Sequence, residues 1–495
     1  MKRFLLLPLH LLFFLLITCS SGNQEPLQKL TYQTEALKKA LKTLEEDPVL
    51  AFGFISFSLR STKTGEEVLH YQGQKSLNVA SNMKLVTTAS ALNILGENYQ
   101  FKTYLQHDGR IEAGVLKGNL YIKGTGDPTL GSYRMKTTPS FDQLLAQWTA
   151  QLRQKGINAI EGNIIADTEA WNNNALPSGW VWGDIGNYYG AAAQALNIAD
   201  NTYQLYLQPA ARIGGEVKVL KTVPTIPSIQ FVNRLTTAAA GTGDRAYIDG
   251  APYSNLRFLH GTIPQGGNFV IKGAIPDPAY LIVQKLSKQL QQQGISVKGK
   301  ALTSLQLLQT KQKLSKERTT LYTHQSPSLS TIIQWINQYS VNLYAEALYK
   351  AIGQALTTEQ PTEAIKKHWQ LKGLRWKGLQ MRDGSGLSPS NGVPINQMTQ
   401  MLHLMTREKH FSTFYNSLPV AGRSGTMASV GGGTLLMNNL RAKTGWMTGV
   451  VAFSGYFKTT AGEQMCFSIS ANRFDANYST MKKKMEKLFL AMIKV

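Results

Sequence analysis

The stretch Ser81-Asn82-Met83-Lys84, followed by the apolar run Leu85–Leu95, carries the strongest signal in this sequence. The run predicts a helix that begins near Ser81. Residues i and i+3 lie on the same face of a helix, so the amine of Lys84 can reach the hydroxyl of Ser81. A serine hydroxyl becomes a good nucleophile when a neighbouring base takes its proton, and a partly desolvated lysine can be that base. Most S-x-x-K sequences are solvated helix faces, so the pair needs support from elsewhere in the chain.

Two short motifs far along the chain supply that support. Ser340-Val341-Asn342 lies between two amphipathic helical runs, and Lys443-Thr444-Gly445 lies in a strand-like segment that starts at Leu440. The order S-x-x-K, S-x-N, K-T-G is that of the penicillin-recognising serine acyl-transferases. Each motif occurs alone by chance, but the three in order, each in its expected element, form a specific signal.

The chain resembles the low-molecular-mass class C penicillin-binding proteins. These are D-alanyl-D-alanine carboxypeptidases and endopeptidases of the penicillin-binding protein 4 type, peptidase family S13. The long interval between Lys84 and Ser340 matches the large insertion of that family. Four further stretches are similar to family motifs, and the resemblance covers nearly the whole mature chain: Gly124–Pro128, Trp180–Asp184, Asp383–Ser388, and Leu418–Gly422 with Gly425-Thr426.

The resemblance implies a catalytic role for five residues. Ser81 would be the nucleophile, and Lys84 would accept its proton during acylation. Ser340 would relay a proton to the departing D-alanine amine. Asn342 would orient Lys84 and bind the substrate amide. Lys443 would maintain the electrostatic potential around Ser340. Beneath these roles lies a general requirement for a nucleophile, a base within reach, a proton relay and convergent hydrogen-bond donors.

The same resemblance implies a set of substrate-binding residues. Thr444 of the K-T-G segment, which also contains Gly445, would bind the substrate carboxylate together with Lys443. The backbone N–H groups of Ser81 and Trp446 would bind the oxyanion. Asp184 could pair with the ammonium of a diaminopimelate side chain, and Tyr189 and Met447 could form an apolar wall. Ordinary packing is an equal alternative for these last three residues.

Two residues depart from the family pattern. Trp446 stands where the family usually has Thr or Ser, so a side-chain hydroxyl is lost and a bulky ring lies beside the site. Pro389 stands where relatives often have an Arg that contacts the free carboxylate of diaminopimelate. The leading hypothesis is a cell-wall peptidase that forms an acyl-enzyme at Ser81 and is inhibited by β-lactams. The alternatives are a non-catalytic peptidoglycan-binding relative with Trp446 blocking the cleft, and a β-lactamase or esterase on the same scaffold.

Composition limits the other possibilities. Lys and Arg number 52 against 30 Asp and Glu, a formal net charge of +22, but no basic run carries interleaved aromatic residues, so we expect no nucleic-acid partner. The eight His residues include no H-E-x-x-H sequence, so we expect no metal site and no cofactor. Attraction to anionic lipid or to cell-wall carboxylates and simple solubility are both open explanations of the charge.

Cys466 lies in an apolar strand pattern and is expected to be a small buried hydrophobe.

The N-terminus predicts export. Lys2 and Arg3 precede the apolar run Phe4–Ile17, which is too short to span a bilayer and reads as part of a signal peptide over residues 1–22. Leu16-Ile17-Thr18-Cys19 looks like a lipobox, although Thr18 is atypical and plain cleavage nearby is the alternative. We expect a periplasmic or outer-surface protein whose membrane contact is a lipid on Cys19.

Segment patterns predict an α/β fold with an interrupted main domain. Strand patterns at Leu50–Arg60 and Glu67–Tyr71, a second hairpin over 450–470 and the Lys443 strand should form one antiparallel sheet flanked by helices, as in the β-lactamase/transpeptidase-like fold. Helices are expected over 27–46 and 481–494. A weak repeat of helix, Gly-Ile, short strand and Gly ends at Gly162 and Gly299. We therefore predict an acyl-transferase domain over 23–105 and 320–495, an inserted α/β domain over 106–185 and 271–319, and a nested β-rich domain over 186–270.

Overall fold

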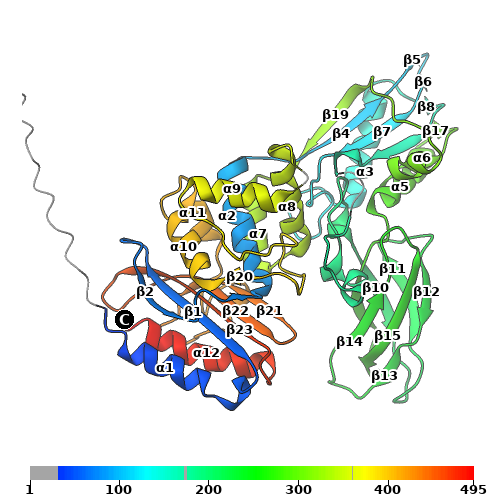
Figure 1. Ribbon diagram of the computed structural model, residues 1–495. Coiled ribbons are helices and arrows are strands. Elements are labelled where there is room, and N and C mark those ends of the chain that lie inside the picture. The colour runs from blue at the N-terminus through cyan, green and yellow to red at the C-terminus, as the bar shows by residue number, and fades with distance from the viewer. Residues whose placement is uncertain (1–31, 172–174, 359) are drawn as a thin grey trace, which may run out of the picture.

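The computed structural model describes residues 32–171, 175–358 and 360–495. Figure 1 shows three regions side by side: a sheet with its helices at the lower left, a mixed region at the upper right and a β-rich region at the lower right. Both ends of the described chain belong to the first region, as the blue and red segments show. The chain therefore leaves this region and returns to it after a long excursion.

The central sheet joins strands from both ends of the chain, and each neighbouring pair is antiparallel. Its order is β2 (Glu67–Tyr71), β1 (Phe54–Ser61), β23 (Gln464–Asn472), β22 (Val450–Lys458) and β21 (Arg441–Met447). The strand β1 pairs with β23 over its whole length, from Phe54 opposite Asn472 to Ser61 opposite Met465. The antiparallel sheet predicted from the sequence is confirmed.

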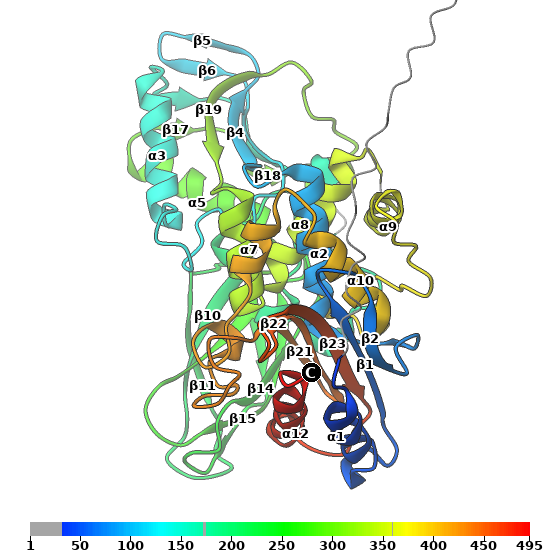
Figure 2. The same ribbon diagram turned by 90° about the vertical axis from the view of Figure 1, so that its left-hand side faces the viewer.

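Helices cover both faces of this sheet, as Figure 2 shows in profile. On one face, α1 (Glu35–Glu45) and α12 (Tyr478–Met492) pack on the alternating side chains Ile55, Phe57 and Leu59 of β1. On the other face, the Ser58 hydroxyl lies 2.8 Å from that of Thr399 in α10 (Ile395–Met405). Because both faces are covered, the strands β22 and β23 are buried along almost their whole length.

The helical layer above the sheet surrounds one core helix. This helix, α2 (Met83–Leu95), is buried at every position from Met83 to Leu92, including polar residues such as Lys84 and Thr87. The other helices of the layer share its core cluster: α7 (Leu329–Tyr339), α8 (Asn342–Ala355), α9 (Pro361–Leu371), α10 and α11 (Phe411–Ser417). Two short strands at the layer's edge, β3 (Ser76–Leu77) and β20 (Val393–Pro394), pair with each other.

The inserted region contains the internal repeat. The helices α3 (Phe141–Gln154) and α5 (Pro278–Gln292) are followed by two short strands each: β8 (Ala159–Ile160) and β9 (Ile164–Asp167), then β17 (Ser296–Val297) and β18 (Ala301–Thr303). Strand β17 pairs with β8 and β18 with β9, both in parallel. The two copies of the repeat therefore lie beside each other. The remaining elements are β4 (Lys102–His107), β5 (Arg110–Glu112), β6 (Val115–Lys117), β7 (Leu120–Gly124), β19 (Thr319–Gln325) and α6 (Ser304–Gln309).

The nested region is built from strands. One sheet has the order β11 (Lys218–Val223), β10 (Thr202–Gln208) and β16 (Phe269–Ala274). The other has β15 (Leu256–Pro264) at its centre, paired with β12 (Gln230–Asn233), β13 (Thr236–Ala238) and β14 (Arg245–Asp249). Apolar residues of both regions, such as Leu144 and Leu205, belong to one continuous hydrophobic cluster.

Some predicted boundaries differ from the observed elements. The strand predicted from Leu50 begins later, because Pro48–Leu50 forms a short 3-10 turn in which the Asp47 side chain accepts the Val49 N–H. Strands β4 and β19 pair within the inserted sheet, so that sheet extends past the predicted edges at 105 and 320. The division into three domains stays a prediction.

The described residues start at position 32. The predicted signal peptide, Cys19 and the first part of the helix predicted over 27–46 lie outside them. Across residues 32–171, 175–358 and 360–495, no helix combines the length and the apolar character needed to cross a bilayer. Cys466 lies in β23, is buried and forms no disulfide, and burial raises the pKa of its thiol to about 12.

Candidate active site

Ser81 lies at the junction between the sheet and the core helix. It occupies the short 3-10 turn Ala80–Asn82 that leads directly into α2, and it is half-buried. The Asn78 side chain accepts the Ala80 N–H at 2.7 Å, and the Asn82 side chain donates to the Ser454 hydroxyl of β22 at 2.8 Å. These contacts fix the turn against the sheet and leave the Ser81 hydroxyl beside the first turn of α2.

Close approach of backbone to backbone holds β21 against this turn. A Cβ built on Gly445 would lie 2.2 Å from the carbonyl oxygen of Val79, far inside van der Waals contact. On the other side of the turn, a Cβ on Gly386 would lie 1.9 Å from the carbonyl oxygen of Ala80. Glycine at both positions therefore lets the K-T-G strand and the 383–388 loop enclose Ser81.

Lys84 is fully buried and makes three hydrogen bonds. Its Nζ lies 3.0 Å from Ser81 Oγ, 2.6 Å from Asn342 Oδ1 and 2.6 Å from the carbonyl oxygen of Ser385. Burial lowers the pKa of Lys84 to about 7, against a smaller opposing effect of the Asp383 and Glu346 carboxylates. A lysine in this state can hold or release a proton near neutral pH, directly beside a serine hydroxyl.

Ser340 and Lys443 form a second serine–lysine pair. Ser340 ends α7 in a left-handed conformation with φ of 58°, which is uncommon for a residue with a side chain. Lys443 Nζ donates to Ser340 Oγ at 3.0 Å and to the carbonyl oxygen of Thr444 at 2.8 Å. Burial, together with the charge of Lys84, holds the pKa of Lys443 well below its usual range. Each lysine of the site therefore faces one serine hydroxyl.

Because β21 is the edge strand of the sheet, the backbone N–H of Trp446 lies on its free side, away from β22. Strand β21 pairs with β22 on one side, and on its other side the Ala442 N–H donates to the carbonyl of Pro419 at 3.1 Å. Backbone groups alternate along a strand, so the N–H groups of Thr444 and Trp446 point to the same edge as that of Ala442. The strand also lies against the Ser81 turn, as the close approach of Gly445 to Val79 shows.

The ring of Trp446 turns toward the C-terminal helix. It packs edge-to-face on Tyr478, the first residue of α12, with 5.9 Å between ring centroids, and the residue is 61% exposed. Met447 ends β21 and is half-buried. Pro389 accepts a hydrogen bond of 3.0 Å on its carbonyl from the Asn78 side chain, which ties the end of the 383–388 loop to the segment before Ser81.

Tyr189 contacts the site through its backbone, and Asp184 lies close to Tyr189. Asp184 lies in α4 (Trp182–Ile185), and Tyr189 lies in the 3-10 turn Tyr188–Gly190. The Tyr189 carbonyl accepts a hydrogen bond of 2.8 Å from Asn342 Nδ2. Burial raises the pKa of Asp184, while a hydrogen bond from Tyr189 opposes the rise; burial followed by the Asp184 charge raises the pKa of Tyr189. The insertion therefore contacts the S-x-N motif directly.

The 383–388 loop has a role that the sequence motifs did not predict. Asp383 is buried and accepts four hydrogen bonds: from the N–H groups of Gly386 and Ser388, from the Asn391 amide and from the Trp180 indole. This network shapes the loop that presents the Ser385 carbonyl to Lys84. The sequence D-G-S-G-L-S was noted as a similarity, but a contact made by a backbone carbonyl leaves no signal in the side-chain pattern.

The geometry defines a site for acyl transfer. A buried lysine contacts a half-buried serine, a second serine–lysine pair lies close enough for the two lysines to interact, and an edge strand supplies outward N–H groups. In the described part of the chain, no cluster of three or more His, Cys, Asp or Glu residues is arranged to hold a metal ion. The structure brings together Ser81, Lys84, Ser340, Asn342 and Lys443, with Tyr189 attached through its backbone.

Comparison with known proteins agrees with this geometry. The model of the D-Ala-D-Ala carboxypeptidase 3 (S13) family matches residues 37–492. The chain is 28% identical over 435 residues to the D-alanyl-D-alanine carboxypeptidase DacB of Haemophilus influenzae, covering 86% of each protein. It is 29% identical over 452 residues to the D-alanyl-D-alanine carboxypeptidase of Actinomadura sp., covering 88% of this chain and 81% of that protein.

A solved structure shares the whole fold. Penicillin-binding protein 4 (DacB) from Haemophilus influenzae superposes with a TM-score of 0.78, covering 93% of this chain and 99% of that one at 24% identity. The same protein complexed with a β-lactam gives a TM-score of 0.72. The fold class expected from the three motifs is therefore confirmed, insertion included.

Proposed function

The chain belongs to the D-Ala-D-Ala carboxypeptidase 3 (S13) family, and we propose that it is a serine-type D-Ala-D-Ala carboxypeptidase that acts on peptidoglycan stem peptides through an acyl-enzyme at Ser81. The observation that carries the proposal is the contact of 3.0 Å between Lys84 Nζ and Ser81 Oγ, made by a lysine whose pKa burial lowers to about 7. Cleavage of a cross-link between two stem peptides is the same reaction with a larger leaving group.

Acylation begins with neutral Lys84. Ser81 Oγ attacks the carbonyl carbon of the penultimate D-alanine, and its proton passes to Lys84 Nζ. The oxygen of that carbonyl becomes negative, and the N–H groups of Ser81 and Trp446 stabilise it. This role of Trp446 is supported by the alternation of β21, because it needs the backbone and not the side chain.

The second pair completes the step. As the bond from carbon to nitrogen breaks, the departing amine takes a proton through the hydroxyl of Ser340, which accepts a hydrogen bond of 3.0 Å from Lys443. Lys443 and Thr444 bind the terminal carboxylate of the substrate. Water then hydrolyses the ester on Ser81 and releases the shortened peptide. A β-lactam acylates Ser81 in the same way, but its leaving group stays attached.

Substrate recognition along the stem peptide involves the insertion. We infer that Asp184 faces the third-position side chain and that Tyr189 and Met447 contact its apolar part, which is supported by the bond between the Tyr189 carbonyl and Asn342. The exposed ring of Trp446 packs on Tyr478, so no contact favours the alternative in which that ring closes the site.

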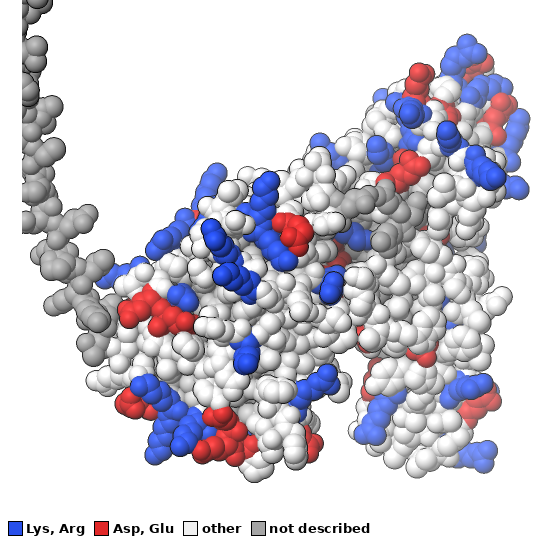
Figure 3. Space-filling model, viewed as in Figure 1, with Lys and Arg blue, Asp and Glu red and all other residues white. Residues whose placement is uncertain are grey.

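The protein acts in the bacterial envelope under this proposal. Export is supported by the charged and apolar N-terminal sequence, and attachment by a lipid on Cys19 is supported by the lipobox-like residues Leu16–Cys19. On the face shown in Figure 3, Lys and Arg side chains are spread among Asp and Glu and form no continuous stripe.

Release of D-alanine tests the proposal. The mature protein, incubated with a synthetic pentapeptide that ends in D-Ala-D-Ala, should release one D-alanine per peptide, and Ser81→Ala should release none. Pentapeptide that stays intact with the wild-type protein, under conditions where a known carboxypeptidase cleaves it, would contradict the proposal.

A further inference from the structure

Glu346 is buried one helical turn beyond Asn342 on α8, and 1% of its surface is exposed. Its Oε1 accepts the backbone N–H of Ser385 at 2.7 Å, and the carbonyl oxygen of the same Ser385 accepts a hydrogen bond of 2.6 Å from Lys84 Nζ. Two hydrogen bonds in series, through one residue, therefore connect this carboxylate to the candidate base.

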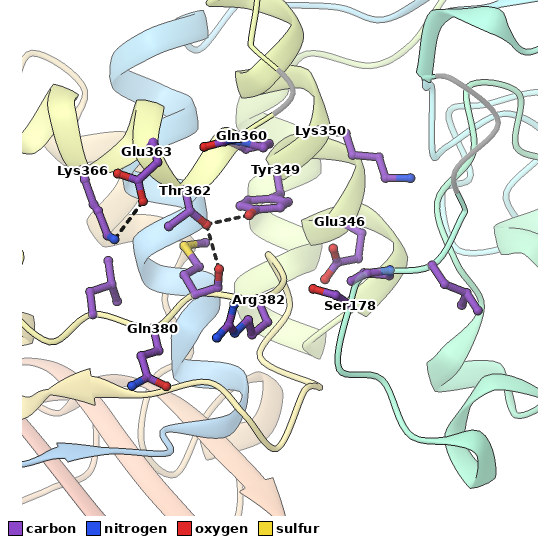
Figure 4. Close-up of a pocket in the computed structure, with 15 residues that line it drawn as sticks. Ser178, Glu346, Tyr349, Lys350, Gln360, Thr362, Glu363, Lys366, Gln380 and Arg382 are labelled. Atoms are coloured by element: carbon purple, nitrogen blue, oxygen red, sulfur yellow. Dashed lines mark hydrogen bonds and ion pairs between the residues drawn. The ribbon is translucent and has the colours of Figure 1, made fainter.

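The second oxygen of Glu346 has a different environment. It is buried, and no hydrogen bond of good geometry reaches it within residues 32–171, 175–358 and 360–495, although the nearby Gly384 N–H and the Ser385 side chain also favour the charged form of the carboxylate. Glu346 lines a cavity of about 520 Å³, together with Ser178, Lys350 and Arg382 (Figure 4). Burying a carboxylate costs free energy that these few hydrogen bonds offset only in part.

Charged groups face Glu346 from three elements. Lys84 approaches from α2 and Asp383 from the loop, and both interact with it electrostatically. Lys350 lies one turn further along α8, and its Nζ donates to the carbonyl of Ala193 at 2.8 Å. Burial lowers the pKa of Lys350 to about 8, and the charge of Glu346 opposes this effect. Tyr349, also on α8, has its pKa raised by burial to about 12, with a smaller contribution from Glu346.

An ion pair from α9 also lines the cavity. Glu363 and Lys366 of α9 lie 2.9 Å apart and both line the cavity, with Arg382 at the other side (Figure 4). Glu363 is exposed, in contrast to Glu346. The chain thus offers two carboxylates on one cavity, and only Glu346 bonds to the loop that contacts Lys84.

We propose that Glu346 is a positioning residue for the base: its carboxylate holds the Ser385 carbonyl on Lys84, and its negative charge favours the protonated form of the Lys84 amine. The proposal rests on the proposed function, because it assigns to Lys84 the proton of Ser81. Burial and the Asp383 charge raise the pKa of Glu346, while the hydrogen bonds from Ser385 and Gly384 oppose the rise and favour its charged form.

Removing the negative charge of Glu346 should lower the pKa of Lys84. Acylation needs neutral Lys84, so its rate rises with pH through the range in which Lys84 loses its proton. A carboxylate beside a lysine favours the charged amine. Glu346→Gln therefore lets Lys84 become neutral at lower pH, and the rising limb of the rate profile moves to lower pH. A purely structural loss would lower the rate at every pH and leave the limb in place.

The experiment measures the second-order rate constant of acylation by a fluorescent penicillin between about pH 5 and about pH 9. For Glu346→Gln we expect the limb to move down by about one pH unit, the size of shift that one neighbouring charge causes. Glu346→Asp keeps the negative charge, but its shorter side chain no longer reaches the Ser385 N–H. For this variant we expect the acylation rate to rise over the same pH range as in the wild type, with a lower maximal rate. Glu363→Gln is the matched control and should coincide with the wild type.

The outcomes separate this inference from the proposed function. A limb for Glu346→Gln that coincides with that of the wild type overturns the role of Glu346 and leaves the function intact. If Glu346→Gln shows no cooperative thermal unfolding, Glu346→Met, which also removes the charge but keeps a similar side-chain size, decides: a limb at lower pH than in the wild type supports the proposal, and a limb at the wild-type pH overturns it. A wild-type protein that takes no label contradicts the proposed function itself.

Discussion

The carbonyl of Tyr189, in the inserted region, accepts a hydrogen bond of 2.8 Å from the side chain of Asn342. The other side-chain atom of Asn342, Oδ1, accepts from Lys84 at 2.6 Å. An amide with both ends bound has one orientation, because its oxygen accepts and its nitrogen donates. The insertion therefore fixes the S-x-N motif and, through it, the lysine beside Ser81. This contact explains how a segment so far from the motifs in sequence can affect acylation.

The first prediction concerns pH. Acylation of the wild type should rise with pH through about 7, because burial lowers the pKa of Lys84 to that value and only the neutral amine takes the proton of Ser81. Lys84→Ala should lose about 10²–10⁴-fold in acylation rate and lose this limb. Stopped-flow labelling with a fluorescent penicillin measures both. Lys38→Ala, on the exposed face of α1, is the control. A labelling rate that rises only near the ordinary pKa of lysine would contradict the role of buried Lys84 as the base.

Gly445→Ala tests the fit of the K-T-G strand against Ser81. The new Cβ would lie 2.2 Å from the Val79 carbonyl, so the strand and the turn must move apart. We expect a loss of about 1–3 kcal/mol in the free energy of unfolding, the usual cost of overpacking, and a loss of labelling. Gly432→Ala, where a Cβ meets open space, should leave both unchanged. Equal behaviour of the two variants would show that β21 approaches less closely.

Trp446→Thr restores the residue type that relatives have after K-T-G. The N–H at this position stays, and the removed ring lies on Tyr478, so acylation by a small β-lactam should change by no more than about twofold to threefold. The measurement is the second-order labelling rate, with Tyr478→Leu as the variant that removes the other ring. A gain of a hundredfold or more, roughly 2.7 kcal/mol, would mean that Trp446 closes the cleft.

Asp184 should select the third-position side chain of the stem peptide. A charged hydrogen bond is worth about 1.5–3 kcal/mol, so kcat/KM should be about ten- to a hundredfold higher for a lysine peptide than for its acetyl-lysine analogue. Asp184→Asn should remove that difference. Because Pro389 cannot supply a cation, the preference for diaminopimelate over lysine should stay below about a hundredfold. Equal rates on lysine and acetyl-lysine would remove Asp184 from the site, and a larger diaminopimelate preference would require another cation.

The sequence predicted the elements that are defined locally. Ser81 and Lys84 share a helix start, so their contact follows from helix geometry, and the alternation in β1 and β23 predicts an antiparallel sheet. The strand β1 begins later than its pattern predicts, because the turn at Pro48 depends on a single hydrogen bond that the Asp47 side chain accepts from the Val49 N–H.

The contacts around Lys84 could not be predicted in the same way. The Ser385 carbonyl and the Tyr189 carbonyl are backbone groups, and any residue type supplies them. Glu346 looks like an ordinary polar residue of an amphipathic helix, and only its burial reveals its contact with Ser385. The orientation of Trp446 depends on Tyr478, a residue from an element on the other face of the sheet.

The position of the covalent adduct tests the central claim most directly. The mature protein is labelled with penicillin, digested with trypsin and analysed by mass spectrometry, in parallel with Ser81→Ala. We predict one adduct, on the peptide that contains Ser81, and none in the variant. An adduct on another residue, or labelling of Ser81→Ala at the wild-type rate, would contradict Ser81 as the nucleophile and with it the function assigned to this site.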